Sequence, residues 1–371
     1  MKIGLDITPI IYGRGVSRYT ANLARSLNNH PELALSALGY SWRQRSVLEN
    51  FVKKNHLPAA SLHSIPTMLM GLMWRLGRNS VKKYLPQLDL FHSWDWQQPP
   101  DQDIPLVSTI HDVAMIKYPE TAHPRILAAH QRSWRILKER QAQIIAVSQT
   151  TKKDIIQLLG IPSYLISVVH EALPAEFKKT SQDLTEEEAN WIKKKLNLNQ
   201  PYLLFVGTRE PRKNLRRLIE AWQPLADKYQ LIVAGAAGWD KSAAINHPQL
   251  RFLGQVKDKE LAVLYGEAEV FCYPSLYEGF GLPILESFFH GTPVLTSKVS
   301  SMPEVAGNAA ELVDPEDVSD IRRGLEKILN ESVDEQKKRL QRMIIRLHMF
   351  SWERVVEETL QVYQRALAAK Q

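Results

Sequence analysis

Two glutamates, Glu278 and Glu286, lie eight positions apart and flank a turn that contains Gly279 and Gly281. The turn follows the apolar run 270–274 and precedes a predicted helix. A carboxylate can accept hydrogen bonds from two adjacent hydroxyl groups, so two carboxylates at this spacing can hold two sugar-like groups of one ligand. The glycines allow phosphate groups to approach backbone N–H groups at the start of the helix. Either glutamate alone is as readily a surface acid, but the combined pattern predicts a site for a sugar and a phosphate.

Three basic residues, Arg209, Arg212 and Lys213, follow Gly207 in the loop after the apolar run 202–207. A predicted helix begins directly after them, and the positive end of a helix dipole adds to the attraction of basic side chains for an anion. This arrangement of guanidinium and ammonium groups suits a diphosphate. A solvated loop is the alternative, but α/β sheets bind ligands at the carboxyl ends of their strands, where this loop lies.

Two loops in the first half of the chain also follow predicted strands. His111 comes directly after the apolar run 105–110, where an imidazole can bond a sugar hydroxyl or stabilise developing charge; a structural histidine is the alternative. Gly13 and Gly15 follow the run 2–7 and precede a helix whose N-terminus can bind an anion. Their spacing does not match a dinucleotide fingerprint, and a glycine turn can also serve only the strand-to-helix geometry.

Short apolar runs alternate with helical patterns along the whole chain, which predicts right-handed crossovers and parallel sheets, the α/β doubly wound architecture. We expect strands over 2–7, 33–40, 88–94, 105–110, 143–147, 202–207, 231–235, 270–274, 293–297 and 310–313. We expect helices over 16–29, 124–140, 149–158, 214–228, 259–267, 282–290 and 315–330.

The polar stretch 174–200 interrupts this alternation and predicts a linker with one helix. We therefore expect two Rossmann-like domains, residues 1–180 and 195–350. The amphipathic tail 351–371 is predicted to pack back on the first domain. A cleft between two such domains is the natural place for a ligand, since the loops at the carboxyl ends of the strands face it.

The chain has 371 residues, 44% of them apolar and 23% charged, which is typical of a soluble protein with more than one core. A single cysteine, Cys272, excludes a disulfide framework and a cysteine-based metal cluster, and is consistent with a reducing cytosol. The sequence shows no signal-peptide pattern and no apolar stretch long enough to span a bilayer. We therefore expect a cytoplasmic protein that is either free or peripheral on the inner face of the cytoplasmic membrane.

The basic residues are concentrated in one segment. Residues 41–88 contain eight Lys or Arg and one acid, Glu49, so this segment carries the whole net charge of +7. Within it, residues 67–85 are rich in Met, Leu and Trp and contain four cations, a pattern that suits an interfacial helix on an anionic membrane. A core-facing helix with a basic solvent side is the alternative. Basic and aromatic residues are not interleaved as in RNA-binding modules, so we expect no nucleic-acid partner.

The stretch from Glu278 to Glu286 resembles the E-x7-E signature of family 4 of the retaining glycosyltransferases, which have the GT-B fold. The resemblance covers nearly the whole chain and extends to the segments 13–15, 110–112, 147–149, 207–213 and 351–354. The run 168–177 lacks the Asn-Gly-Val-Asp sequence that the family often has there.

The resemblance implies a role for each matching residue. Glu278 would contact the transferred sugar and Glu286 the ribose hydroxyls. Arg212 and Lys213, with Arg209, would bind the diphosphate, and His111 would lie by the reactive face of the sugar. Backbone N–H groups around Gly279, Phe280, Gly281 and Leu282 would hold the sugar and the phosphates. The remaining donor-binding positions implied are Gly13, Gly15 and Gly207.

The implied reaction is transfer of a sugar from a nucleotide diphosphate sugar to a hydroxyl group, with retention of configuration and with neither a cofactor nor a metal. The sequence is most similar to bacterial mannosyltransferases that use GDP-mannose, and UDP-sugars are the alternative donors. A saccharide or lipid-linked saccharide in cell-surface polysaccharide (lipopolysaccharide) assembly is the expected acceptor. Two rival classes of protein stay open: a sugar phosphorylase or nucleotide-sugar epimerase on the same architecture, and a non-catalytic nucleotide-sugar-binding protein.

Overall fold

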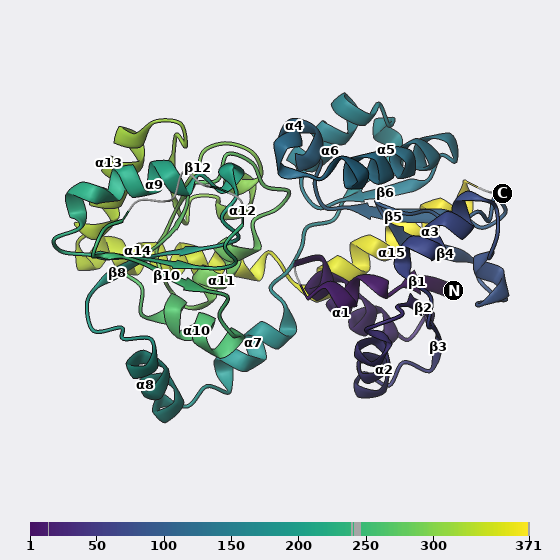
Figure 1. Cartoon of the computed structure of the whole chain (residues 1–371), viewed down its shortest axis with the longest axis horizontal. Helices are drawn as coiled ribbons and strands as arrows, with labels where there is room; N and C mark the ends of the chain where they lie inside the picture. The colour runs from purple at the N-terminus through teal and green to yellow at the C-terminus, as the bar shows by residue number, and fades with distance from the viewer. Residues whose placement is uncertain (14, 239, 241–245, 370–371) are drawn as a thin grey trace. The chain divides into compact units, whose positions relative to one another are not determined.

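The computed structural model describes residues 1–13, 15–238, 240 and 246–369, and the chain divides into two compact units (Figure 1). Unit 1 combines Met1–Glu171 with the C-terminal segment from Trp352, and unit 2 is Ala172–Ser351. The last two residues of the predicted tail helix, 370–371, lie outside the described residues. The helix α7 (Ala175–Gln182) contacts α10 (Asp258–Gly266) and belongs to unit 2, so the boundary of unit 1 lies before residue 180.

Within its described residues, unit 1 contains a seven-stranded parallel sheet in the order β3-β2-β1-β4-β5-β6-β7. The inner strands are buried along most of their length, as expected for a parallel sheet covered on both faces. The edge strands β3 and β7 are short and partly exposed, and the apolar runs did not predict them. The strands are β1 (Lys2–Asp6), β2 (Ala34–Tyr40), β3 (Ala59–His63), β4 (Leu90–Trp94), β5 (Leu106–Ile110), β6 (Gln143–Ala146) and β7 (Ile166–Val168).

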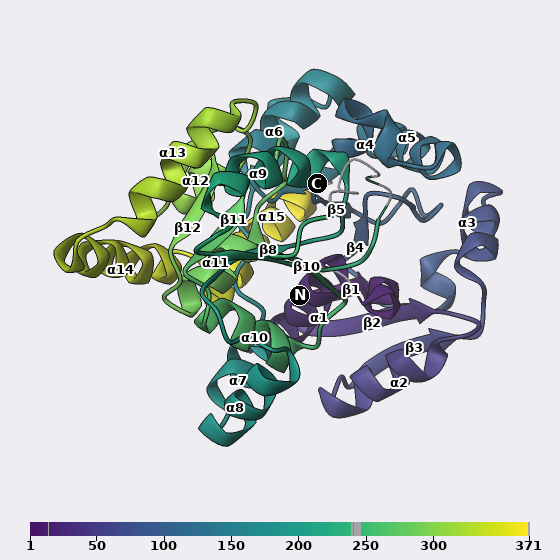
Figure 2. The same ribbon diagram turned by 60° about the vertical axis from the view of Figure 1, so that its left-hand side comes forward.

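The helices of unit 1 connect these strands and cover the sheet. They are α1 (Gly15–Asn28), α2 (Arg45–Lys54), α3 (Thr67–Arg75), α4 (Ala114–Lys117), α5 (Pro124–Glu139), α6 (Gln149–Asp154) and α15 (Trp352–Ala368). Ser148 caps α6 by accepting a hydrogen bond from the Thr151 N–H at 3.0 Å. At one edge of the sheet, α2 packs against β3 (Figure 2).

The C-terminal helix α15 belongs to unit 1, although its residues are far from the rest of the unit in the sequence. It packs against α1 and against β4, β5 and β6, and is drawn in yellow in Figure 1. Buried Tyr363 of α15 lies 2.7 Å, hydroxyl oxygen to Nδ1, from buried His92 of β4. The sheet of unit 1 is therefore covered on one side by the end of the chain.

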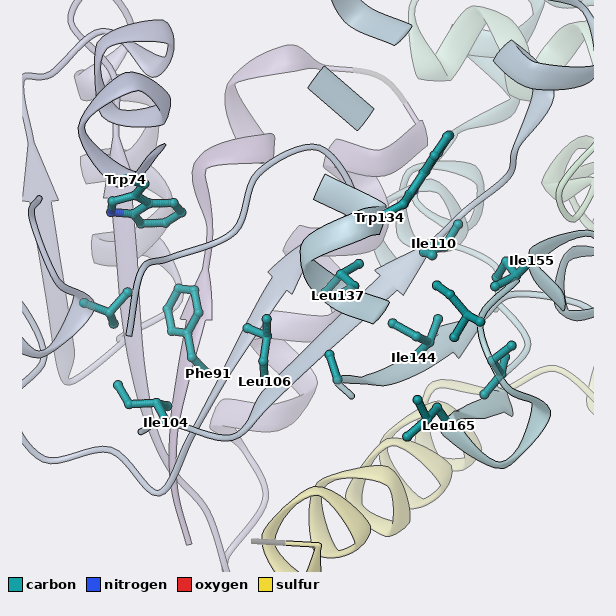
Figure 3. Close-up of a cluster of buried hydrophobic side chains, with 14 of the residues drawn as sticks. Trp74, Phe91, Ile104, Leu106, Ile110, Trp134, Leu137, Ile144, Ile155 and Leu165 are labelled. Carbon is teal, nitrogen blue, oxygen red and sulfur yellow. The ribbon is translucent and has the colours of Figure 1, made fainter. Parts of the chain in front are cut away.

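A continuous cluster of apolar side chains from the sheet of unit 1 and from helices such as α3 and α5 forms its core. Figure 3 shows Leu106 and Ile110 of β5 with Trp134 and Leu137 of α5, all buried. Trp74 of α3 is part of the same cluster.

The interfacial pattern predicted one helix over residues 67–85, but the structure does not have a single helix there. The helix α3 ends at Arg75, Gly77 adopts a left-handed φ of 68°, and a 3₁₀ turn follows at Val81–Lys83. Met70 and Trp74 point into the core, whereas Met68 is 87% exposed. The segment therefore has both a core-facing side and an exposed apolar side.

Unit 2 contains, in its described residues, a six-stranded parallel sheet in the order β10-β9-β8-β11-β12-β13. The strands are β8 (Tyr202–Val206), β9 (Gln230–Ala234), β10 (Leu250–Gly254), β11 (Val270–Tyr273), β12 (Val294–Ser297) and β13 (Glu311–Val313). The remaining helices are α8 (Glu186–Lys195), α9 (Leu215–Trp222), α11 (Leu282–Phe289), α12 (Met302–Ala306), α13 (Val318–Leu329) and α14 (Val333–His348).

The predicted linker 174–200 contains two helices, α7 and α8, rather than one. A capping box begins α8: the Thr185 side chain accepts from the Glu188 N–H, and the Glu188 carboxylate accepts from the Thr185 N–H. The fold thus brings the predicted loops of unit 2 to one edge of its sheet, because β8 and β11 are neighbours and parallel.

Candidate functional site

Glu278 binds both Arg212 and Lys213 in unit 2. The Arg212 Nη1 atom donates to Glu278 Oε2 at 2.8 Å, and the Lys213 Nζ atom donates to Glu278 Oε1 at 2.7 Å. Glu278 is buried, and the side chains of Arg212 and Lys213 are largely buried. The cations follow β8 and the glutamate follows β11, so the adjacency of these two strands brings the groups together. The sequence predicted each residue as part of a site, but not that the carboxylate would hold both cations.

We call Arg212, Lys213 and Glu278 the Glu278 cluster. The two cations favour the ionised form of the Glu278 carboxyl group. Burial alone would raise the pKa of Glu278, but Arg212, Lys213 and hydrogen bonds outweigh it and lower the pKa from 4.5 to about 2. Burial lowers the pKa of Lys213, and neighbouring Arg212 lowers it further, whereas Glu278 opposes that shift. The two cations are therefore a preformed place for a negative charge, which the Glu278 carboxylate occupies in this structure.

Three residues that the sequence analysis did not select complete the surroundings of the cluster. The Tyr273 hydroxyl accepts from Lys213 Nζ at 2.9 Å, and the Lys213 Nζ atom lies 5.0 Å from the centre of the Tyr273 ring. Glu210 accepts from Arg212 Nη2 at 3.1 Å. The Tyr277 carbonyl oxygen accepts a bond of 2.7 Å from Arg212.

Asn214 fixes the cationic loop to its neighbours. It has a left-handed φ of 61° and a buried side chain, whose amide donates to the carbonyl oxygens of Pro274 at 3.0 Å and Pro315 at 2.6 Å. Asparagine is one of the few residues other than glycine that adopts this conformation readily. The only sequence feature that could have indicated this role is that an asparagine stands where the helix α9 begins.

The turn after Glu278 is held by two serines that follow β12. The Ser301 hydroxyl donates to the carbonyl oxygens of Glu278 at 2.9 Å and Phe280 at 2.7 Å. Ser300 both donates to the Glu278 carbonyl oxygen and accepts from the Glu278 N–H. Phe280 is buried and contacts Phe350 edge-to-face, with ring centres 5.5 Å apart. The protein's own hydrogen bonds and packing thus hold the turn in place.

The start of α11 has the geometry expected for close approach of a ligand. Gly281 has a left-handed φ of 116° immediately before Leu282, the first residue of the helix. Glu286 lies on this helix, is buried, and accepts a hydrogen bond from the Tyr265 hydroxyl at 3.0 Å. The structure therefore places the second glutamate on α11 rather than in the Glu278 cluster.

Arg209 does not join the cluster through any contact recorded in the described residues. Its guanidinium group lies over the ring of Phe252, 4.8 Å from the ring centre. Its loop is closely packed on the next one: a Cβ atom added at Gly235 would lie 2.0 Å from the Gly207 carbonyl oxygen. Gly235 thus has to be glycine for this contact, and it also has a φ of 138°.

In unit 1, His111 directly follows β5 and is paired with Glu171, a residue the sequence analysis passed over. The distance from His111 Nδ1 to Glu171 Oε1 is 2.8 Å. Gly13 ends a 3₁₀ turn, Thr8–Tyr12, with a left-handed φ of 64°, and Gly15 is the first residue of α1. Gly13 thus ends the 3₁₀ turn that follows β1, and Gly15 begins α1.

Family models match both halves of the chain. A model described as Glycosyltransferase Family 4 matches residues 13–177, and one described as Glycosyl transferases group 1 matches residues 187–345. The chain is 34% identical over 273 residues to O-antigen chain mannosyltransferase B of Escherichia coli, which covers 70% of each protein. It is 30% identical over 246 residues to the serotype-specific mannosyltransferase WbdA of Escherichia coli, spanning 63% of this chain and 30% of that protein.

Solved structures share the fold at low sequence identity. The glycosyltransferase from Rickettsia africae ESF-5 has a TM-score of 0.75 and 16% identity, with 99% of this chain and 98% of that chain covered. Anabaena Alr3699/HepE in complex with UDP and glucose has a TM-score of 0.71 and 16% identity, with 98% and 100% covered.

Proposed function

This chain belongs to glycosyltransferase family 4 and has the GT-B fold, and we propose that it transfers mannose from GDP-mannose. The proposed acceptor is a hydroxyl group of a saccharide or lipid-linked saccharide in the assembly of a cell-surface polysaccharide. The observation that carries the proposal is the Glu278 cluster at the carboxyl edge of the unit 2 sheet. The names of the mannosyltransferase relatives support mannose as the sugar.

In the proposed donor complex, Arg212 and Lys213 bind the diphosphate of GDP-mannose. The diphosphate then replaces the Glu278 carboxylate as the anion beside these two cations, and Glu278 accepts hydrogen bonds from the hydroxyl groups of the mannose. The N–H groups at Gly281 and Leu282 approach the donor closely, because the glycine leaves the backbone open. Glu286 takes the ribose hydroxyls.

The proposed reaction proceeds with retention of configuration and without a metal ion. The bond between C1 of mannose and the β-phosphate oxygen breaks, and its electron pair leaves with that oxygen. The acceptor oxygen bonds to C1 on the same face, and its proton passes to the departing phosphate, giving GDP. Arg212 and Lys213 stabilise the charge that develops on the diphosphate. No separate carboxylate nucleophile is then required.

Two competing functions make different predictions for nucleotide binding. A UDP-sugar-dependent glycosyltransferase has the same cluster but prefers uracil, and a non-catalytic protein binds the donor without turnover. A thermal-shift panel of GDP, GDP-mannose, UDP and UDP-sugars ranks the bases and sugars, because a ligand at a hundred times its Kd adds about 2.7 kcal/mol to the stability of the native state. Stabilisation by UDP-sugars alone would refute GDP-mannose as the donor, and binding with no transfer to any acceptor would favour the non-catalytic function.

We further propose that the exposed side of 67–85 contacts an anionic membrane, which brings a lipid-linked acceptor to unit 1. Met68, Leu72 and Leu76 are exposed there beside Arg75 and Arg78. Apolar side chains next to cations suit the interface of an anionic bilayer. The buried Trp74 takes no part, contrary to the sequence pattern. In the described residues, no helix combines the length and the apolar character that crossing a bilayer requires.

A further inference from the structure

Glu171 reaches across the sheet of unit 1 to the ring of His111. His111 follows β5 and Glu171 follows β7, with β6 between them. Both side chains are largely buried, with exposed fractions of 15% for His111 and 8% for Glu171. The segment before Glu171 is fixed, because the Val169 N–H donates to the Ala146 carbonyl oxygen at 2.9 Å. The carboxylate is therefore held in place by the end of β7.

The contacts of His111 leave one ring atom available. An ionised carboxylate only accepts hydrogen bonds, so the 2.8 Å contact with Glu171 places a proton on His111 Nδ1. The ring is stacked on Trp94, with centres 6.0 Å apart and planes 16° apart, and meets Tyr19 edge-to-face at 4.9 Å. Among the described residues, the buried Nε2 atom has no hydrogen-bond partner. A buried polar atom without a hydrogen-bond partner destabilises the fold, and a ligand that bonds to it would offset that cost.

We propose that Glu171 is a positioning residue that holds His111 through Nδ1, so that Nε2 is the atom presented to a sugar hydroxyl. The identity of that ligand rests on the proposed function, whereas the hold of Glu171 on His111 does not. In this arrangement His111 is the residue that touches substrate, and Glu171 acts only through it.

The charged groups around His111 support this assignment. The carboxylates of Glu171, Asp95 and Asp112, which follow β7, β4 and β5, act on the His111 ring. Two other titratable groups lie near it, His92 of β4 and Tyr19 of α1. Burial alone would lower the pKa of His111, but the carboxylates, with Glu171 foremost, raise it above the ordinary value. The imidazolium form, in which Nε2 is a donor, thus persists to a higher pH than in a free histidine.

Glu171→Gln tests the proposal, because it keeps an oxygen acceptor of the same reach but removes the charge. Two-dimensional NMR of the histidine rings, without substrate, gives the His111 pKa and the nitrogen that carries its proton. We expect the His111 pKa to fall in the variant. The matched control, Glu139→Gln, changes an exposed glutamate of the same unit and should leave that pKa unchanged.

Turnover provides the second readout. We expect Glu171→Gln to lower kcat by about 10- to 100-fold, the range known for carboxylate partners that orient metal-binding histidines, with a smaller change in the KM for the donor. The limb of the pH–rate profile that follows His111 should shift with its pKa, and Glu171→Asp should recover part of the activity. An unchanged His111 pKa, or a lowered pKa with unchanged kcat, would overturn the proposal.

The parent protein supplies a test that needs no variant and no turnover. Its ring nitrogen shifts at neutral pH should show His111 protonated on Nδ1; a ring protonated on Nε2 alone would overturn the proposal even if Glu171→Gln failed to fold. Because this measurement uses no donor, it separates failure of the Glu171 assignment from failure of the proposed transferase activity, which the thermal-shift panel and transfer assay report.

Discussion

Lys213→Met removes one of the two cations of the Glu278 cluster but keeps an unbranched side chain in the same space. The pKa of Glu278 falls from 4.5 to about 2 in the fold, and a shift of this size corresponds to about 3 kcal/mol of stabilisation of a negative charge. This is a net value, because burial opposes the two cations and hydrogen bonds add to them. We take about half of it, about 1.5 kcal/mol, as the scale of one cation's contribution. We propose that the charge on the departing diphosphate develops beside these cations, so the loss of Lys213 raises the barrier by about 1.5 kcal/mol or more.

This corresponds to a fall in kcat of at least about 10-fold, approaching the roughly 100-fold usual for one preorganised donor. The measurement is steady-state transfer from GDP-mannose to a saccharide acceptor, with kcat and KM determined separately. Arg216→Met is the matched control, because Arg216 lies in the adjoining helix α9 but forms an exposed pair with Glu220. A variant at Lys213 with unchanged kcat and a raised KM would show that this cation serves ground-state binding alone, and would refute the reasoning.

Glu278→Ala should abolish transfer while GDP still raises the melting temperature; transfer at the rate of the parent protein would end the assignment of Glu278 to the sugar. Glu278→Gln should remove the part of the unfolding free energy that depends on ionisation of Glu278. Because the folded-state pKa of about 2 lies below 4.5, ionised Glu278 stabilises the fold above pH 4.5, and this contribution is lost as the pH falls from 4.5 toward 2. The difference in unfolding free energy between parent and variant, measured in urea, should therefore shrink between pH 7 and pH 3.5. For the membrane proposal, the protein should cosediment with acidic vesicles at low salt, and Arg75→Gln with Arg78→Gln should weaken this; equal cosedimentation of the double variant would contradict the proposal.

Much of the fold could be predicted because buried parallel strands are continuous apolar runs. The strands β1, β5 and β8 lie within one residue of their predicted ends. The edge strands β3 and β7 could not be found this way, since an edge strand is half exposed and need not be apolar. The edge strand β10 was missed for the same reason, and its second residue is the charged Arg251.

The candidate site was predictable in composition but not in its internal pairing. Sequence spacing placed Glu278 and Lys213 in loops at strand ends, yet only the neighbouring positions of β8 and β11 in the sheet bring them within 2.7 Å. Glu171 was missed because its contact with His111 spans 60 positions and no local pattern records such a pair. The burial of Trp74 in the core could not be predicted either, because an apolar helix face suits a protein core as well as a lipid surface.

The return of α15 to unit 1 has a consequence for the order in which the chain folds on the ribosome. Unit 2 is contiguous in sequence and has all its residues available once Ser351 has emerged. The residues before Ala172 emerge earlier, but the sheet of unit 1 lacks the cover of α15, and His92 lacks Tyr363, until Trp352–Ala368 has been synthesised. Because domains generally fold as they emerge during synthesis, the first unit to be made is the last to be finished. A released chain truncated after Ser351 should therefore show protease resistance in unit 2 but not in unit 1.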